Sequence, residues 1–183
     1  MKVIDIKSKD SIHDAAKVLK NSGILVFPTD TVYGIGCLNK IAAIKKLYQI
    51  KNRLLSQPTT ILIDKDNLLD FNISENVKSS FYTGETTLIV SRDLINFKPC
   101  NILLKNEKVG VRIPNNLWLR DLIRKVGLIV ASSANKKGQP TPGKFDEIDS
   151  EIISQVDIAF RTDEKLSGKA SRVYDLETKK YFR

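Results

Sequence analysis

The chain has 183 residues, with 30 Lys and Arg against 21 Asp and Glu, which gives a formal net charge of +9. This length is sufficient for one domain with a hydrophobic core. No apolar run approaches the ~20 residues that span a bilayer, and residues 1–9 alternate in polarity, unlike a signal peptide. We therefore expect a cytoplasmic protein with no membrane segment.

The few cysteines and histidines and the positive net charge limit which functional sites the chain can form. Cys37 and Cys100 form neither a disulfide framework nor a metal cluster and fit a reduced compartment. His13 is the only histidine, which argues against His-clustered metal sites and a Ser-His-Asp triad. The scattered positive charge favours polyanions such as nucleotide phosphates or RNA. A lysine-rich surface that only aids solubility would explain the charge equally well.

The first third of the chain alternates short apolar strands with amphipathic helices. Strands are predicted at residues 3–6, 24–27 and 60–63. Asp10 or Ser11 can cap a helix that ends before Gly23, and Asn39 can cap a second helix that runs into Lys51.

A polar segment follows the strand at residues 24–27. Pro28 ends this strand, because proline has no N–H to give to a neighbouring strand. Gly34 and Gly36 allow a bent or closely approached backbone, so we expect a loop here. Its polar side chains are Thr29, Asp30, Thr31 and Tyr33. Such a loop suits a ligand site in an α/β sheet, although a plain polar turn also fits.

The rest of the chain continues the alternation, with a less regular stretch at residues 93–108. Helices are predicted at residues 74–81, 117–126 and around 148–153. Strands are predicted at residues 87–91, 109–113, 128–131 and 158–161, with a closing hairpin at 172–176 and 180–183. Strands and helices mix throughout, which predicts a single α/β domain over residues 1–183 with a mixed sheet.

Two short polar patterns suit anion or nucleotide binding. Arg53 can hold a phosphate or carboxylate through two parallel N–H bonds, and Lys51 adds a compact charge. Alone, Lys-x-Arg is typical of a solvated surface. Ser133 and Asn135 offer a hydroxyl and an amide for phosphate, ribose or base edges. Ser133-x-x-Lys136 also matches a motif of penicillin-binding enzymes, but its companion motifs are missing, as are the P-loop and Rossmann signatures.

In this order, the segments resemble the YrdC/TsaC family of threonylcarbamoyl-AMP synthases. The matching pieces are Pro-Thr-Asp-Thr-Val-Tyr-Gly at 28–34, Lys51-x-Arg53, Gly-Val-Arg-Ile-Pro at 110–114, Ser133-x-Asn135, Gly-Gln-Pro at 138–140, and Ser171-x-Val173 with Asp175. The resemblance covers nearly the whole chain. It implies a twisted mixed sheet flanked by helices around a large positive cavity.

The resemblance also implies a reaction. L-threonine, bicarbonate and ATP would give threonylcarbamoyl-adenylate and pyrophosphate, the first step of tRNA threonylcarbamoyladenosine formation. Threonylcarbamoyl-transferase partner enzymes would then act on tRNA. Mg²⁺ would be carried with ATP, since no dedicated carboxylate cage is visible in the sequence.

Roles for single residues follow from the same resemblance. Lys51 and Arg53 would be catalytic and would face the ATP phosphates and the bicarbonate-derived group. The threonine-binding candidates are Thr29, Thr31, Tyr33, Thr87 and Ser171. The further ATP-binding candidates are Ser133, Asn135, Thr141 and Arg183. The chain departs from the family pattern at residues 83–86, at Lys137 and at Arg172, and residues 54–63 lack a histidine that some relatives have.

Two other functions stay open at this point. The positive charge also suits a basic module that binds tRNA or double-stranded RNA without chemistry. The same fold could also transfer a different acyl group, as in carbamoyl-transfer relatives.

Overall fold

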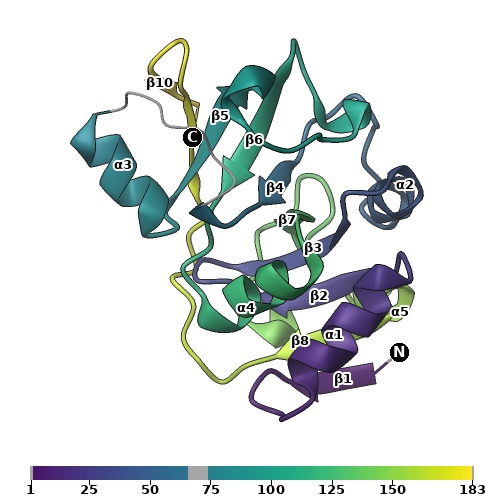
Figure 1. Cartoon of the computed structure of the whole chain (residues 1–183). Coiled ribbons are helices and arrows are strands. Elements are labelled where there is room, and N and C mark those ends of the chain that lie inside the picture. Colours follow the sequence, from purple (N-terminus) through teal and green to yellow (C-terminus); the bar gives the residue numbers. More distant parts are fainter. Residues whose placement is uncertain (1, 66–73, 183) are drawn as a thin grey trace.

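The computed structural model describes residues 2–65 and 74–182 (Figure 1). Its strands are β1 (Lys2–Asp5), β2 (Leu25–Pro28), β3 (Tyr33–Leu38), β4 (Thr60–Leu62), β5 (Thr86–Ser91), β6 (Lys108–Arg112), β7 (Ile129–Ser133), β8 (Ile158–Arg161), β9 (Arg172–Asp175) and β10 (Lys180–Tyr181). They form one mixed sheet in the order β1-β8-β2-β3-β7-β4-β6-β5-β9-β10. The predicted α/β fold with a mixed sheet is confirmed.

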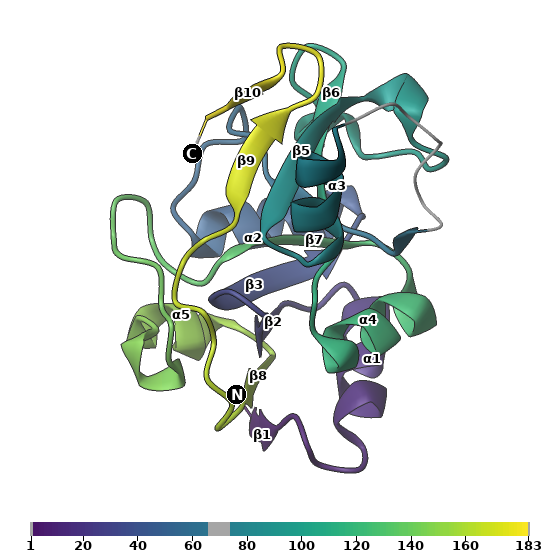
Figure 2. The same ribbon diagram turned by 90° about the vertical axis from the view of Figure 1, so that its left-hand side faces the viewer.

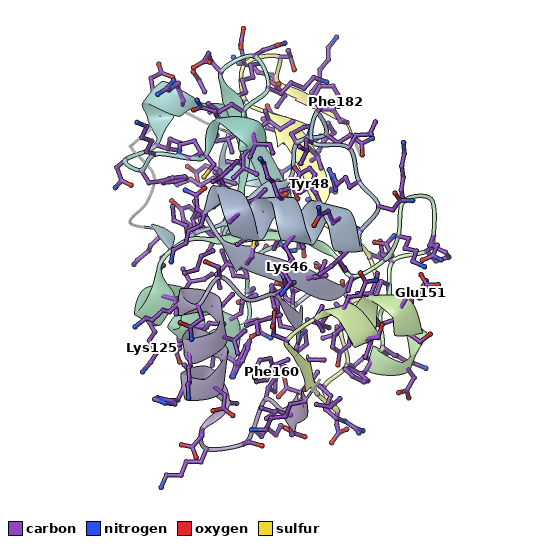
Figure 3. The ribbon with its side chains drawn as sticks, turned by 90° about the vertical axis from the view of Figure 1, so that its right-hand side faces the viewer. Lys46, Tyr48, Lys125, Glu151, Phe160 and Phe182 are labelled. Atoms are coloured by element: carbon purple, nitrogen blue, oxygen red, sulfur yellow. The ribbon has the colours of Figure 1, made fainter. Side chains whose placement is uncertain are left out.

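The helices are α1 (Ser11–Lys20), α2 (Ile41–Ile50), α3 (Glu75–Tyr82), α4 (Leu117–Val126) and α5 (Ser150–Gln155). Helices α1 and α4 lie side by side near β2 and β8 (Figure 1). Figure 3 shows Phe160 of β8 between α1 on one side and α5 on the other. Among the described helices, none combines the length and the apolar character that a membrane crossing requires.

The sheet separates two hydrophobic cores, because alternate residues of a strand point to opposite faces. In β2, Val26 packs into the core that contains residues of α2, α3 and α5. Leu25 and Phe27 pack into the core that contains residues of α1 and α4. On this second face, α1 and α4 cover the half around β2, β7 and β8. The other half, over β4, β6, β5 and β9, carries the cavity described below.

One expected loop is in fact a strand. Gly34 and Gly36 belong to β3, which pairs with β2 and β7. A Cβ atom on Gly34 would come within 3.0 Å of the Phe27 ring, and one on Gly36 within 2.8 Å of the Val130 carbonyl oxygen. These glycines therefore allow close packing within the sheet. The expectation that they loosen a loop is wrong, and the loop is limited to residues 29–32.

Of the suggested helix caps, Asp10 occupies the N-cap position of α1, whereas Asn39 does not cap α2. Asp10 makes no side-chain cap hydrogen bond, and Ser11 instead donates to the Ile6 carbonyl oxygen at 2.7 Å. The residue before α2 is Lys40, not Asn39. The Asn39 side chain joins β3 to the irregular stretch, because it accepts from the Cys100 backbone N–H at 3.0 Å. The contact between Asn39 and Cys100 has no local sequence signature, because its partners lie 61 residues apart.

Candidate active site

A cavity of about 670 Å³ opens over the uncovered half of the sheet face. Figure 2 shows β9 beside β5 on the side of the molecule that carries this half. The candidate residues that line the cavity are Thr29, Thr31, Tyr33, Arg53, Thr87, Ser133 and Ser171. The charged residues of the lining are Arg53, Lys105, Lys108, Arg112 and Asp175. Lys51, Asn135 and Thr141 lie outside the lining, and Arg183 lies outside the described residues.

Lys51 directly follows α2 and connects the Lys-x-Arg pattern with the Ser133-x-Asn135 pattern. Its side chain is buried, and its Nζ donates to the backbone carbonyl oxygens of Ser133 and Asn135. Segments 82 and 84 residues apart therefore meet directly. Burial, and secondarily the charge of Arg53, lower the pKa of Lys51 to about 7. Near neutral pH the Lys51 amine is therefore only partly protonated, and a bound anion would favour its charged ammonium form.

Arg53 lines the cavity itself. Its guanidinium donates to the Pro58 carbonyl oxygen and, at 3.3 Å, to Ser132 Oγ. It also lies 5.6 Å from the centre of the Tyr48 ring. Its Nε is buried and has no hydrogen-bond partner among the described residues. Burial lowers the pKa of Arg53, but an arginine stays charged at neutral pH. A desolvated cation of this kind is suited to binding an anion.

The turn after β7 is held by its own side chains. Ser133 Oγ donates to Asn135 Oδ1 at 2.5 Å, and Asn135 Nδ2 donates to the Gln139 carbonyl oxygen at 2.6 Å. Ser133 lines the cavity, while both polar atoms of the Asn135 amide are engaged within the turn. In this arrangement Asn135 shapes the turn that Ser133 and Lys51 share.

Tyr33 occupies a different position from the other candidates. It lines the cavity, but its hydroxyl accepts the Thr162 backbone N–H at 3.1 Å. Its ring meets the Phe145 ring edge-on, with 5.9 Å between the centroids. Burial raises the pKa of Tyr33, so its hydroxyl stays protonated at neutral pH.

Arg112 is a site residue to which the sequence motifs assign no separate role. It is 7% exposed, and its Nη2 lies 2.8 Å from Asp30 Oδ2 and 2.9 Å from Thr31 Oγ1. Thr31 Oγ1 in turn lies 2.9 Å from Thr29 Oγ1. The alternation Lys108, Gly110, Arg112 in an otherwise apolar strand is the signal that could have identified it, since it places polar groups on one face.

The far wall of the cavity is formed by the last strands of the sheet. Thr87 Oγ1 of β5 lies 2.9 Å from Ser171 Oγ, just before β9. Beyond them, Lys108 Nζ pairs with Asp175 Oδ2 at 3.0 Å. Although burial opposes it, hydrogen bonds from the Thr178 N–H and from Lys108 lower the pKa of Asp175. The two threonine-binding candidates thus touch each other across the parallel pair of strands.

Comparison with known proteins identifies the family. A family model for Sua5, YciO and YrdC proteins, described as "Telomere recombination", matches residues 17–183. The putative threonylcarbamoyl-AMP synthase of Methanocaldococcus jannaschii is 28% identical over 172 residues, which cover 90% of this chain and 79% of that protein. The threonylcarbamoyl-AMP synthase of Bacillus subtilis is 30% identical over 166 residues, which cover 84% of this chain and 48% of that protein.

Solved structures agree with this match. Sua5 of P. abyssi, crystallised with L-threonine, superposes with a TM-score of 0.82 and is 25% identical, covering 97% of this chain and 55% of that one. E. coli YciO has the same fold, with a TM-score of 0.78 and 22% identity, covering 96% of this chain and 88% of that one. The chain thus spans about half the length of the Bacillus and P. abyssi relatives. It belongs to the Sua5/YciO/YrdC family.

Proposed function

We propose that the protein is a threonylcarbamoyl-AMP synthase, which uses L-threonine, bicarbonate and ATP and releases pyrophosphate. The curated relatives that carry this name match 84% and 90% of the chain. One structural observation carries the proposal. Lys51 donates to the Ser133 and Asn135 carbonyl oxygens, and Arg53, which lines a cavity large enough for small substrates, donates to the neighbouring Ser132 hydroxyl. The product would start threonylcarbamoyladenosine formation in tRNA.

The reaction needs placement and charge stabilisation more than a protein nucleophile. The threonine amine and bicarbonate form a carbamate with loss of water. A carbamate oxygen then attacks the α-phosphorus of ATP, and pyrophosphate leaves. These reactants are anionic, and the first product is labile in water. Cations in a partly enclosed cavity can align the reactants and stabilise the charge that develops in the transition state.

The residues that line the cavity, together with Lys51 beside it, would share these tasks. Arg53 would face the triphosphate, and Lys51 would gain a proton as phosphate approaches. The hydroxyls of Thr29, Thr31, Thr87 and Ser171 would bind L-threonine. Mg²⁺ would arrive with ATP and neutralise part of its charge. No group of three metal-binding side chains occurs among the described residues. The carboxylates Asp30 and Asp175 are already paired with Arg112 and Lys108.

A substrate-omission experiment tests the proposal. The protein is incubated with ATP, bicarbonate and labelled L-threonine, and each is left out in turn. We expect pyrophosphate and a labelled adenylate only when all three are present. Pyrophosphate release that ignores threonine would contradict the proposal. Steep salt-dependent RNA binding with no thermal response to ATP or threonine would instead favour the basic RNA-binding module.

A further inference from the structure

The cavity floor consists of side chains in rows that cross four strands. Residues in register on neighbouring strands point to the same face. One row runs through Thr60, Gly110, Ile89 and Asp175, on β4, β6, β5 and β9. All four residues line the cavity. Gly110 alone in this row has no side chain, which leaves a gap between Thr60 and Ile89.

Neither the backbone nor the packing explains this glycine. Gly110 is not among the described residues with a positive φ, so its conformation suits any amino acid. A Cβ atom there would lie 3.6 Å from both Thr60 Oγ1 and Thr87 Cγ2, which is ordinary contact. Gly110 is also half-buried, although strands flank it on both sides. Glycine weakens a strand interior and often marks a close approach of a ligand to the backbone.

The two ends of the row differ in chemistry. Thr60 lies two residues after Pro58, whose carbonyl oxygen accepts from the Arg53 guanidinium, so this end is cationic. Beyond Gly110 the lining also carries charge, from Lys105 and from Asp175, which is paired with Lys108. Its apolar side chains at this end are those of Ile89, Val173 and Phe182. Phe182 is 65% exposed, and Figure 3 shows it at the end of the molecule where β9 lies. Three strand spacings separate the two ends, roughly 14 Å.

We propose that the nucleoside part of ATP lies against the Gly110 backbone, and that the missing side chain at this position determines whether the cavity accepts a nucleotide. The triphosphate then lies toward Arg53, and the base lies toward Ile89 and Phe182. A flat ring against a peptide plane, with an apolar wall beside it, needs the space that a side chain would take. This inference rests on the proposed function, because it assigns a position to the ATP of that reaction.

Two substitutions fill the gap to different degrees, and one serves as a control. Gly110→Ala adds a methyl group without a clash, and Gly110→Val adds a larger one. Gly143→Ala makes the same change outside the cavity lining, where a Cβ atom would lie 3.5 Å from Gly168 Cα. Titration calorimetry measures the affinity for ATP with Mg²⁺ and, separately, for L-threonine. Thermal melts without ligand check the fold of each variant.

We expect Gly110→Ala to weaken ATP binding about tenfold, as an overpacked contact would, and Gly110→Val to abolish measurable binding. L-threonine affinity and melting temperature should stay close to those of the parent, and Gly143→Ala should bind both ligands normally. Because alanine fits without a clash, Gly110→Ala keeps the test valid even if the valine variant does not fold.

Four results would overturn the inference in different ways. Parent-like ATP affinity in both Gly110 variants would remove the role of the gap and leave the proposed function intact. Loss of threonine binding with ATP binding kept would assign the gap to the amino acid. Equal loss in Gly143→Ala would show that the effect does not come from the cavity. A parent protein that binds no ATP would reject both the inference and the proposed function.

Discussion

Two halves of the same sheet face follow one periodicity but serve different purposes. On the half that α1 and α4 cover, Leu25 and Ile129 point toward the helices and are fully buried. On the open half, the equivalent positions carry polar residues such as Thr87 and Arg112, which are 3% and 7% exposed. Buried polar groups are costly unless they are hydrogen-bonded, and these two reach Ser171 and Asp30. The difference shows that alternation determines which side chains point inward, while residue chemistry decides whether that face becomes a core or a site.

The largest expected effect is a loss of stability from a substitution in the core of the covered half, away from the site. Leu122 of α4 is fully buried, so Leu122→Ala should lower the free energy of unfolding by about 2–5 kcal/mol. Leu117 lies on the same helix but is 78% exposed, so Leu117→Ala should change the free energy of unfolding by less than about 0.5 kcal/mol. Urea unfolding measures both. Equal effects from the two substitutions would contradict this division of the helix.

The converse substitution removes a residue from the open half and should lower activity without unfolding the protein. Arg53→Ala should lower kcat/KM about 100-fold, equivalent to about 2.7 kcal/mol, because a preorganised cation is lost from the charged transition state. Lys45 is exposed on α2, so Lys45→Ala removes the same charge away from the cavity and should keep full activity. Pyrophosphate release measures both. An Arg53→Ala enzyme with parent-like activity would reject the role proposed for Arg53.

Adjacent threonines on β5 give a sharper comparison, since they point to opposite faces. Thr86 Oγ1 lies 2.9 Å from Ser80 Oγ, and Thr87 Oγ1 lies 2.9 Å from Ser171 Oγ. Thr86→Val and Thr87→Val should each cost about 1 kcal/mol of stability, because each loses one buried hydrogen bond. Only Thr87→Val should also raise the KM for L-threonine, roughly three- to tenfold. A similar rise in Thr86→Val would count against a specific threonine site at Thr87.

The smallest effect concerns pH. The pKa of Lys51 is about 7 in the folded protein and near 10.5 when unfolded, so between these values the unfolded chain binds more protons. Stability should therefore rise with pH in this window, by about 1 kcal/mol from pH 7 to pH 8. Lys51→Met should flatten this rise, whereas Lys45→Met should keep it. Urea unfolding across the window measures the slopes, and identical slopes in all three proteins would contradict the lowered pKa.

Much of this arrangement is predictable from sequence because it depends on local pattern. The apolar runs predicted most strands, and the ordered motifs joined Lys51 and Arg53 to Ser133. The rest depends on distant partners. Gly34 resembles a loop residue until the Phe27 ring is placed against it. The hydrogen-bond acceptors of the Lys51 side chain are backbone carbonyl oxygens, which every residue has and no motif marks. Arg112 needed its neighbours across the sheet before its place at the site could be recognised.

The far wall of the cavity has a consequence for the last part of the chain. Strand β9 joins the sheet beside β5, and only the two-residue β10 lies outside it. A substrate that contacts both Thr87 and Ser171 would therefore hold β9, near the edge of the sheet, against β5. Loading the enzyme should slow hydrogen–deuterium exchange at residues 172–181 more than in the helices, so these final strands would report whether the enzyme is loaded.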